Sequence, residues 1–327
     1  MSSNTNTIDG FLPSLPWHAR AVLSLLKNIQ VGQLQVISPE GEHLTFKGAH
    51  AGIEATIQIH DWEVCKSCLK SGDIGFAESY IKGLCDSPDL LALLRLLLAN
   101  RQEIETIIYG NWWGRLGYRI KHWFNKNTKA GSKKNIHAHY DIGNAFYSLW
   151  LDPSMTYSSA CFDNKDTPLV EAQIAKYQKI IQSLTVAPGE KILEVGCGWG
   201  GLMEQACLNG INIDCLTISE EQAKYARERG GRIQSTDSGT HQVLLQDYRD
   251  HQEQYDGIAS IEMFEAVGES YWPSYFEMLQ RCLKPGKKAC IQTIVIADDL
   301  FEKYRNSSDF IQQYVFPGGM LPSEEKF

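Results

Sequence analysis

A glycine-rich turn lies between an apolar run and a predicted helix in the C-terminal half of the chain. Gly196, Gly198 and Gly201 follow the run KILEV, and Leu202 begins a helical pattern. Glycine is favoured at such a turn because its backbone adopts angles closed to other residues and lets a ligand approach closely. The same glycines satisfy the G-x-G-x-x-G pattern of dinucleotide sites. The spacing therefore predicts a nucleotide-type cofactor and leaves S-adenosylmethionine and a nicotinamide cofactor both open.

The residues around this turn favour S-adenosylmethionine. Glu194 lies two residues before the first glycine, a usual position in S-adenosylmethionine sites. The turn also begins at residue 196, behind a long N-terminal region, whereas dinucleotide-binding folds commonly start with this unit. Against either cofactor, the next apolar run ends at residues 216–218 without the acid that usually binds ribose hydroxyls, and Glu220 and Glu221 come slightly later. The nicotinamide cofactor therefore remains the weaker alternative.

Strands and helices alternate regularly around the turn, from about residue 136 onward. This alternation predicts a parallel sheet covered by helices on both faces, with the ligand at the carboxyl ends of the strands. The predicted strands are 191–195, 211–218, 241–246, 257–261 and 289–296, and the predicted helices are 202–208, 220–229 and 271–282.

The N-terminal part of the chain has a different pattern. Short apolar runs separated by turn residues (QLQVIS, GEHLTFKG and ATIQIHDW) predict an antiparallel sheet, and residues 89–105 have the spacing of an amphipathic helix. We expect a small α+β domain over residues 1–110. Cys65 and Cys68 form a single C-x-x-C without a second pair at zinc-finger spacing, so no metal site is predicted there.

Composition limits the classes of function. The net charge of −8 argues against a nucleic-acid-binding protein, which needs a basic face. No run approaches the roughly 20 apolar residues of a transmembrane helix. The N-terminus lacks a secretory signal, and the nine scattered cysteines favour reduced thiols. These features predict a cytoplasmic protein.

One segment departs sharply from the acidic average. Residues 111–135 contain seven lysines and arginines and no acidic residue, with five aromatic residues interleaved. Basic residues are attracted to anionic lipid headgroups, and Trp and Tyr favour the membrane interface. The segment predicts peripheral contact with the inner face of the membrane, or alternatively an interdomain linker whose aromatic residues pack on either domain.

Six motifs follow one another between residues 139 and 323: HYDIGNAFYSLWLDPSMTYSSACF, ILEVGCGWGGL, LTISEEQ, QDYRD, EMFEAVGESYW and FIQQYVFPGGMLPS. In sequence and in order they resemble the motifs of the cyclopropane-fatty-acyl-phospholipid synthase (mycolic acid cyclopropane synthase-like) family of S-adenosylmethionine-dependent methyltransferases. GDIGFAESYIKG also resembles the lipid-binding domain of longer bacterial members. The resemblance implies a Rossmann-like class I methyltransferase domain over residues 136–327, preceded by a small α+β lipid-binding-type domain and a basic aromatic linker over residues 111–135.

The resemblance implies cyclopropanation of a phospholipid acyl chain at the membrane surface. The π electrons of a cis double bond attack the methyl carbon of S-adenosylmethionine, and a base then removes a proton from the added carbon so that the ring closes. Such a site must shield the cation from water and hold a base beside it. A homodimer is compatible with the resemblance, but the sequence does not fix the oligomeric state.

The matching motifs assign roles to particular residues. Glu265 matches the family's active-site glutamate, which helps to hold a bicarbonate ion that acts as the base, and Ser159 and Ile261 fall at other positions of that bicarbonate cradle. The expected cofactor-binding residues are Tyr157, Ser158, Glu194, Gly196, Gly198, Ile218, Gln222, Asp247 and Tyr248.

Plainer roles compete with several of these assignments. Glu265 could stabilise a helix N-terminus, and Tyr157 and Tyr248 could be packing residues. Trp199 and the cluster from His139 to Asp141 are interpreted as structural.

Three departures from the family pattern bear on the reaction. Ser159 replaces the usual cysteine, Gln292 replaces a histidine, and Glu262 replaces the glycine that commonly precedes the MFE run. We hypothesise that Glu262 takes over part of the bicarbonate arrangement, since two close carboxylates raise one pKa and supply a protein-borne base. The alternative is that Glu262 forms an ordinary surface ion pair. Similar substitutions occur in relatives that make methyl or methylene branches, and the same carbocation leads to a branch or a ring, so a branched product remains an alternative.

The end of the chain is a fourth departure. Family members continue well past FPGGMLPS and carry a catalytic tyrosine there, whereas this chain ends at Phe327. The resemblance therefore implies a C-terminally truncated domain whose sheet has an uncovered edge. A protein that binds lipid or cofactor without catalysis remains an alternative.

Overall fold

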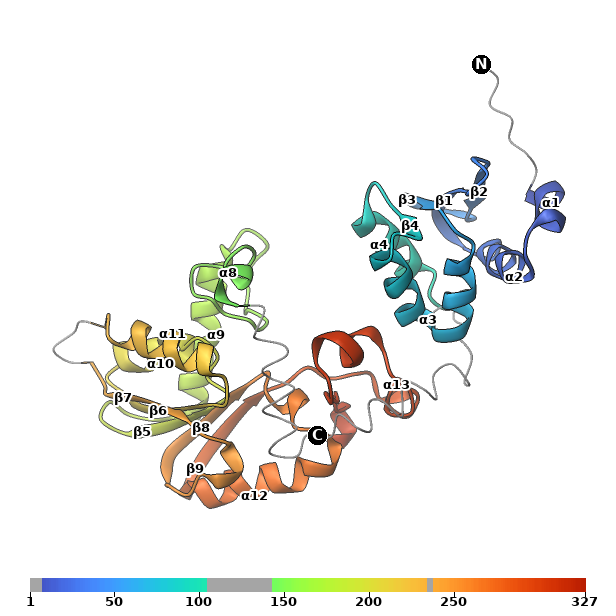
Figure 1. Cartoon of the computed structure of the whole chain (residues 1–327). Coiled ribbons are helices and arrows are strands. Elements are labelled where there is room, and N and C mark those ends of the chain that lie inside the picture. Colours follow the sequence, from blue (N-terminus) through green and yellow to red (C-terminus); the bar gives the residue numbers. More distant parts are fainter. Residues whose placement is uncertain (1–7, 105–142, 234–237) are drawn as a thin grey trace. The chain divides into compact units, whose positions relative to one another are not determined.

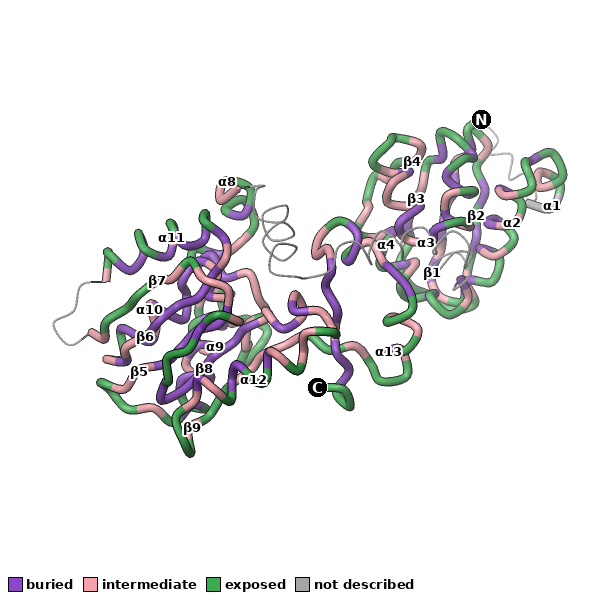
Figure 2. The backbone as a smooth tube through the Cα atoms, turned by 60° about the horizontal axis from the view of Figure 1, so that its bottom comes forward, coloured by how far each residue is buried: buried purple, intermediate pink, exposed green. Residues whose placement is uncertain are grey.

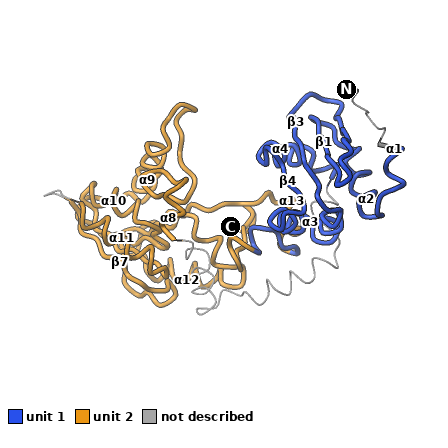
Figure 3. Tube along the Cα trace, turned by 45° about the horizontal axis from the view of Figure 1, so that its top comes forward, with its two compact units in different colours: residues 1–121, 306–313 blue, residues 122–305, 314–327 orange. Residues whose placement is uncertain are grey.

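The computed structural model describes residues 8–104, 143–233 and 238–327 (Figure 1). The chain forms two compact units, residues 1–121 with 306–313, and residues 122–305 with 314–327 (Figure 3). The predicted domain boundaries at residues 110 and 136, the basic segment 111–135 and the cluster from His139 to Asp141 all lie outside the described residues.

The N-terminal unit contains a four-stranded sheet in the order β2-β1-β3-β4. Its strands are β1 (Val31–Ile37), β2 (His43–Lys47), β3 (His50–Ile59) and β4 (Cys85–Asp86). The predicted antiparallel sheet is wrong for one pair, because β3 runs parallel to β1. The chain crosses the start of β1 at Gly48, whose N–H donates to the Gly32 carbonyl at 2.9 Å. A Cβ on Gly48 would lie 2.4 Å from the Gln30 carbonyl, so only glycine permits this crossing.

Four α-helices lie in the described part of the N-terminal unit: α1 (Ile8–Phe11), α2 (Trp17–Leu26), α3 (Glu63–Ile81) and α4 (Leu90–Ala99). Helices α2 and α3 were not predicted, and α4 ends six residues before the predicted end at residue 105. The Asn100 amide ends α4 by donating to the Leu96 and Val31 carbonyls, at 2.9 and 2.8 Å. Cys65 and Cys68 lie in the hydrophobic core of this unit.

A short segment from the C-terminal part of the sequence belongs to the N-terminal unit. The Phe310 N–H donates to the Asp73 carboxylate at 3.0 Å, just after a kink in α3 at Gly72. Burial raises the pKa of Asp73 to about 6. Residues 306–313 therefore join the N-terminal unit through a contact between residues 237 positions apart in the sequence.

The C-terminal unit contains a five-stranded parallel sheet in the order β7-β6-β5-β8-β9. Its strands are β5 (Lys191–Val195), β6 (Asn212–Thr217), β7 (His241–Leu245), β8 (Tyr255–Ile261) and β9 (Leu283–Gln292). The predicted parallel sheet is confirmed. The last strand begins and ends earlier than predicted, because Thr293 and Ile294 turn out of the sheet and donate to the Glu265 carboxylate. Within the described residues β9 forms one edge of the sheet.

Helices cover both faces of this sheet, as predicted. Residues of α9 (Leu169–Leu184), α10 (Gly201–Leu208) and α11 (Glu220–Gly230) share one hydrophobic core with the strands. Residues of α12 (Trp272–Cys282) form a second core with the strands. Figure 2 shows the central strands β5, β6 and β8 as largely buried. Within the described ranges, no helix is long and apolar enough to cross a bilayer.

Candidate functional site

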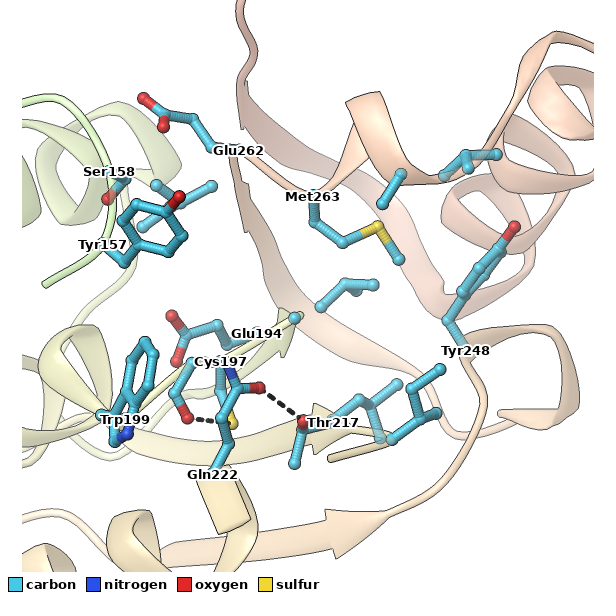
Figure 4. Close-up of a pocket in the computed structure, with 18 of the residues that line it drawn as sticks. Tyr157, Ser158, Glu194, Cys197, Trp199, Thr217, Gln222, Tyr248, Glu262 and Met263 are labelled. Carbon is cyan, nitrogen blue, oxygen red and sulfur yellow. Dashed lines mark hydrogen bonds between the residues drawn. The ribbon is translucent and has the colours of Figure 1, made fainter. Parts of the chain in front are cut away.

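A pocket lies at the carboxyl ends of β5, β6 and β8, where the sequence places the ligand. The chain leaves β5 toward β6 on one side and reaches β8 on the other, which is the switch point where open α/β sheets bind ligands. All nine residues expected to bind the cofactor line this pocket, namely Tyr157, Ser158, Glu194, Gly196, Gly198, Ile218, Gln222, Asp247 and Tyr248. Figure 4 shows Tyr157 and Tyr248 on opposite sides of it, with Glu194 between them.

The glycine turn shapes the wall of the pocket beside β5. Gly196, Gly198 and Gly200 have φ angles of 85°, 51° and 81°, a region that side chains disfavour. A Cβ on Gly196 would also lie 2.7 Å from Cγ of Met263, another lining residue. The Gly196 N–H donates to the Leu216 carbonyl at 3.0 Å and thereby fixes the turn to the end of β6. The glycines therefore keep open the space that a ligand needs.

Glu194 points into the pocket from β5 and is 3% exposed. Its Oε2 contacts Sγ of Cys215 at 3.7 Å. Burial raises the pKa of Glu194 to about 8, although the nearby Lys176 acts in the opposite direction. Binding of a cation in this pocket would favour the ionised carboxylate.

A hydroxyl and an amide stand near the tip of β6, where an acid was missing from the sequence. The Thr217 hydroxyl donates to Oε1 of Gln222 at 2.9 Å, as Figure 4 shows. Ser219 caps α11 by accepting from the Gln222 N–H at 3.2 Å. These bonds fix the Gln222 side chain against the pocket.

Asp247 and Tyr248 form the far side of the pocket, after β7. Both Asp247 oxygens accept from the Arg249 guanidinium, at 2.8 and 2.6 Å. Tyr248 packs edge-on against Tyr275 with ring centroids 5.8 Å apart, and burial raises the pKa of Tyr248 to about 12. The paired arginine fixes the Asp247 carboxylate, and the packing fixes the aromatic face beside it.

Aromatic side chains surround Tyr157 on the opposite side. Phe316 stacks on Tyr157 with centroids 6.3 Å apart, and Trp150 meets it edge-on at 5.3 Å. Phe316 lines the pocket, and no role was predicted for it from its motif. Trp199, predicted to be structural, is 4% exposed, and its indole N–H donates to the Asn144 amide oxygen at 2.7 Å; it also lines the pocket.

Two buried polar residues of α9 hold the Tyr157–Ser159 loop, and neither was predicted from the sequence. Gln173 donates to the Ser158 carbonyl at 2.8 Å, and the Lys176 ammonium donates to the Ser158 hydroxyl at 2.6 Å. Lys176 is 1% exposed, and burial lowers its pKa to about 8. Both residues fall on the buried stripe of α9, beside Ala172, Tyr177 and Ile180. Polar residues in the apolar phase of a helical pattern are the signal that would have found them.

The three residues that depart from the family pattern lie together at the carboxyl ends of β8 and β9. Oε1 of Glu262 accepts from the Ser159 N–H and from the Ser159 hydroxyl, both at 2.8 Å. The same oxygen accepts from the Gln292 amide at 2.9 Å. Ser159 and Gln292 do not line the pocket, whereas Glu262 does. Glu262 therefore connects this cluster to the pocket.

Glu265 lies beside this cluster, in the short 3₁₀ helix after β8. Its Oε1 accepts from the Thr293 hydroxyl at 2.9 Å and from the Ile294 N–H. Its Oε2 is buried without a hydrogen-bond partner among the described residues. Burial raises the pKa of Glu265, with the Glu262 charge acting in the same direction. Glu265 does not line the pocket, whereas Ile261, at the end of β8, does.

Comparison with known proteins assigns the family. The family described as "Mycolic acid cyclopropane synthetase" matches residues 127–327. The chain belongs to this family of S-adenosylmethionine-dependent methyltransferases. Its fold is that of the class I members.

Individual relatives agree with this assignment. The tuberculostearic acid methyltransferase UfaA1 of Mycobacterium tuberculosis is 34% identical over 78% of this chain and 61% of its own length. The cyclopropane-fatty-acyl-phospholipid synthase of Escherichia coli K12 is 36% identical over 82% of this chain and 67% of its own length. The chain thus spans about two thirds of these two relatives.

A solved structure shows the same fold. The crystal structure of the mycolic acid cyclopropane synthase CmaA1, complexed with SAH and CTAB, is 32% identical. It covers 59% of this chain and 71% of its own, with a TM-score of 0.54.

Proposed function

We propose that this protein transfers a one-carbon unit from S-adenosylmethionine to the cis double bond of an unsaturated phospholipid acyl chain, forming a cyclopropane ring. The observation that carries the proposal is the pocket at the switch point of the sheet, where all nine expected cofactor residues meet in a member of this family. S-adenosylmethionine supplies an electrophilic methyl carbon. The chain's own residues bind the cofactor, orient it, and accept the proton that leaves.

The lining of the pocket fits S-adenosylmethionine. The glycine turn leaves room for a ligand backbone, and Glu194 offers a carboxylate to a ligand that carries positive charge. Tyr248 offers an aromatic face to the adenine ring of the cofactor, and the amide of Gln222 and the carboxylate of Asp247 offer polar partners. The relative CmaA1 was crystallised with SAH, which has the same adenosine and amino-acid parts.

Apolar side chains near the pocket support a lipid substrate. Phe146, Leu149 and Trp150, in and just after α8 (Asn144–Tyr147), are 43%, 81% and 49% exposed. Trp150 contacts Tyr157, which lines the pocket. Large exposed apolar residues grouped in this way are typical of membrane or partner contacts. The basic aromatic composition of residues 111–135 supports approach to an anionic membrane surface.

A methylene branch is the second candidate product. After methyl transfer the acyl chain carries a cation; a hydride shift from the methylated carbon, followed by loss of a methyl proton, leaves a methylene group instead of a ring. The Glu262 carboxylate stands at a position where the family usually has glycine, and this substitution supports the methylene branch as a candidate product. The relative UfaA1, whose name specifies tuberculostearic acid methyltransferase, supports the same alternative.

The test is incubation of the whole chain with S-adenosylmethionine and vesicles of cis-monounsaturated phospholipid. The matched control is vesicles of the corresponding saturated phospholipid, which offer the same surface without a double bond. We expect acyl chains heavier by one CH₂ only in the unsaturated vesicles, with upfield ring protons in the NMR spectrum.

Other outcomes decide between the alternatives. Vinylidene protons with the same mass gain would establish the methylene branch. Calorimetric binding of S-adenosylmethionine without any mass gain would contradict catalysis by this chain and favour the binding-only alternative. Absence of both binding and mass gain would contradict the proposed function altogether.

A further inference from the structure

Glu262 has a backbone conformation that its residue type disfavours. It directly follows β8 and has a φ of 46°, in the left-handed region. Its N–H donates to the Gln292 carbonyl at 2.8 Å, which holds it beside the end of β9. The family usually has glycine here, and glycine would adopt this φ without strain. Strained residues cluster at functional sites, so a glutamate retained at this position calls for a functional reason.

The Glu262 side chain provides that reason through its contacts. Oε1 accepts three hydrogen bonds: from the N–H and hydroxyl of Ser159, and from the amide of Gln292. No donor among the described residues contacts Oε2. The side chain is half-buried and lines the pocket near Tyr157 and Ser158, as Figure 4 shows. One oxygen is therefore held in place while the other remains able to take a proton.

The donors that the resemblance assigns to a bicarbonate cradle already contact Glu262. The resemblance assigns Ser159 to the bicarbonate cradle, and Gln292 replaces a histidine of the family pattern. In this chain the Ser159 N–H and the Gln292 amide both point at a carboxylate that is part of the protein. A glutamate carboxylate and bicarbonate share the same planar pair of oxygens, so one can occupy the donors of the other.

We propose that Glu262 is the base of the reaction and occupies the cradle that the family resemblance assigns to bicarbonate. The proposal rests on the proposed function and names the proton acceptor of that same site. The double bond forms a C–C bond to the methyl carbon, the C–S bond breaks, and its electron pair leaves with S-adenosylhomocysteine. Oε2 of Glu262 then takes a proton from the added carbon, and the C–H electrons close the ring. The proton passes from Glu262 to water, which restores the carboxylate.

Two residues of α9 position this base from behind the loop. Gln173 and Lys176 both hold Ser158, through its carbonyl and its hydroxyl. Ser159, the next residue, provides two of the three donors to Glu262. The base is thus fixed by β8 through its backbone and by α9 through the loop.

The experiment compares wild type, Glu262→Gln and Glu262→Gly in buffers freed of CO₂ and in the same buffers with added bicarbonate. We expect wild-type turnover to be the same in both. Glu262→Gln should lose at least about 100-fold in turnover in either buffer, because an amide cannot take the proton and still fills the cradle. Glu262→Gly should be inactive without bicarbonate and regain turnover when it is added. Glu253→Gln, an exposed carboxylate whose side chain is 66% exposed, is the matched control and should behave as wild type.

A binding measurement keeps the test independent of turnover. Carbon-13 NMR of labelled bicarbonate should show ion bound to Glu262→Gly and none bound to wild type, while calorimetry shows S-adenosylmethionine bound to both. Bicarbonate-dependent turnover of the wild type, unchanged turnover of Glu262→Gln, or equal ion binding by wild type and Glu262→Gly would each overturn the proposal. Failure of the proposed function would instead appear as no turnover in any variant or buffer, wild type included.

Discussion

Two neighbouring parallel strands, β5 and β8, are each followed by a residue with a left-handed backbone conformation, but the two residues differ in type. Gly196 follows β5 with a φ of 85°, and Glu262 follows β8 with a φ of 46°. At the first position glycine accepts the left-handed conformation without strain and leaves space for the cofactor. At the second, a glutamate accepts a cost of about 1–2 kcal/mol and places a carboxylate in the pocket. The part of the site beside Gly196, the cofactor end, follows the family pattern. The part beside Glu262, the reaction end, departs from that pattern and carries backbone strain.

The largest expected effect concerns the unstrained turn. Gly196→Val should weaken S-adenosylmethionine binding by about 100-fold or more, because its Cβ would lie 2.7 Å from Cγ of Met263 and valine resists a positive φ. Calorimetric titration measures the loss. Gly189→Val is the matched control, since Gly189 has a φ of 87° with no atom within 4 Å of the added Cβ.

The control separates backbone strain from lost space. Gly189→Val should lower the unfolding temperature as Gly196→Val does, yet keep cofactor affinity within about threefold. Equal affinity losses in both variants would show that strain alone, and not the shape of the pocket, explains the effect. The proposed contrast between the two strand ends would then fail.

The sequence predicted the cofactor end of the site better than the reaction end. Strand–helix alternation and the glycine spacing depend on local residue patterns, so the parallel sheet and the position of the pocket were predictable. The contact between Ser159 and Glu262 joins residues 103 positions apart, and no local pattern encodes it. The resemblance to the family assigned Ser159 to the bicarbonate cradle and marked both residues as departures, but the hydrogen bonds between them were not predicted.

The wrong predictions for the N-terminal unit have a similar cause. A two-residue connection between β2 and β3 predicts an antiparallel hairpin, but the close approach at Gly48 carries the chain across β1 instead. Helix α4 ends early because Asn100 bonds to Val31, a residue 69 positions away. In both cases a tertiary contact overrides the local preference.

The second prediction tests whether α9 positions the base. Lys176→Met should lower turnover by about tenfold while S-adenosylmethionine affinity changes little, because the Ser158 hydroxyl loses its 2.6 Å bond to the ammonium. The pH profile of turnover should also change near pH 8, where the lowered pKa of Lys176 places its titration. Lys179→Met, on the exposed face of α9, is the matched control and should leave rate and profile unchanged. A lower rate with an unchanged pH profile would indicate a purely structural role.

The third prediction concerns the pH dependence of stability. Burial raises the pKa of Glu194 from 4.5 to about 8. The folded chain therefore holds a proton that the unfolded chain releases, so this contribution to stability is complete below pH 4.5 and is lost as the pH rises through 8. Glu194 contributes at most about 1.4 kcal/mol per pH unit to the slope of the unfolding free energy against pH. Urea unfolding between pH 5 and pH 8 should show a flatter dependence for Glu194→Gln than for wild type, and identical slopes would contradict the raised pKa.

The smallest expected effect comes from removing one hydrogen bond to the Glu262 carboxylate. Ser159→Ala removes one of the three donors to Glu262 and keeps the backbone N–H at 2.8 Å and the Gln292 amide at 2.9 Å. Turnover should therefore fall by less than about tenfold, because the two remaining donors still hold the carboxylate oxygen and a typical hydrogen bond contributes only about 1 kcal/mol. Gln292→Met provides the comparison, because it also removes one donor but from the neighbouring strand β9.

The two variants together distinguish shared support from a single dominant contact. If Ser159→Ala and Gln292→Met each cost less than about tenfold and the double variant costs more than their product, the donors act together on one carboxylate oxygen. A double variant no worse than the poorer single variant would mean that the strained backbone of Glu262 alone orients the base. The strained backbone of Glu262 would then determine the orientation of its carboxylate, and the hydrogen bonds from Ser159 and Gln292 would contribute little.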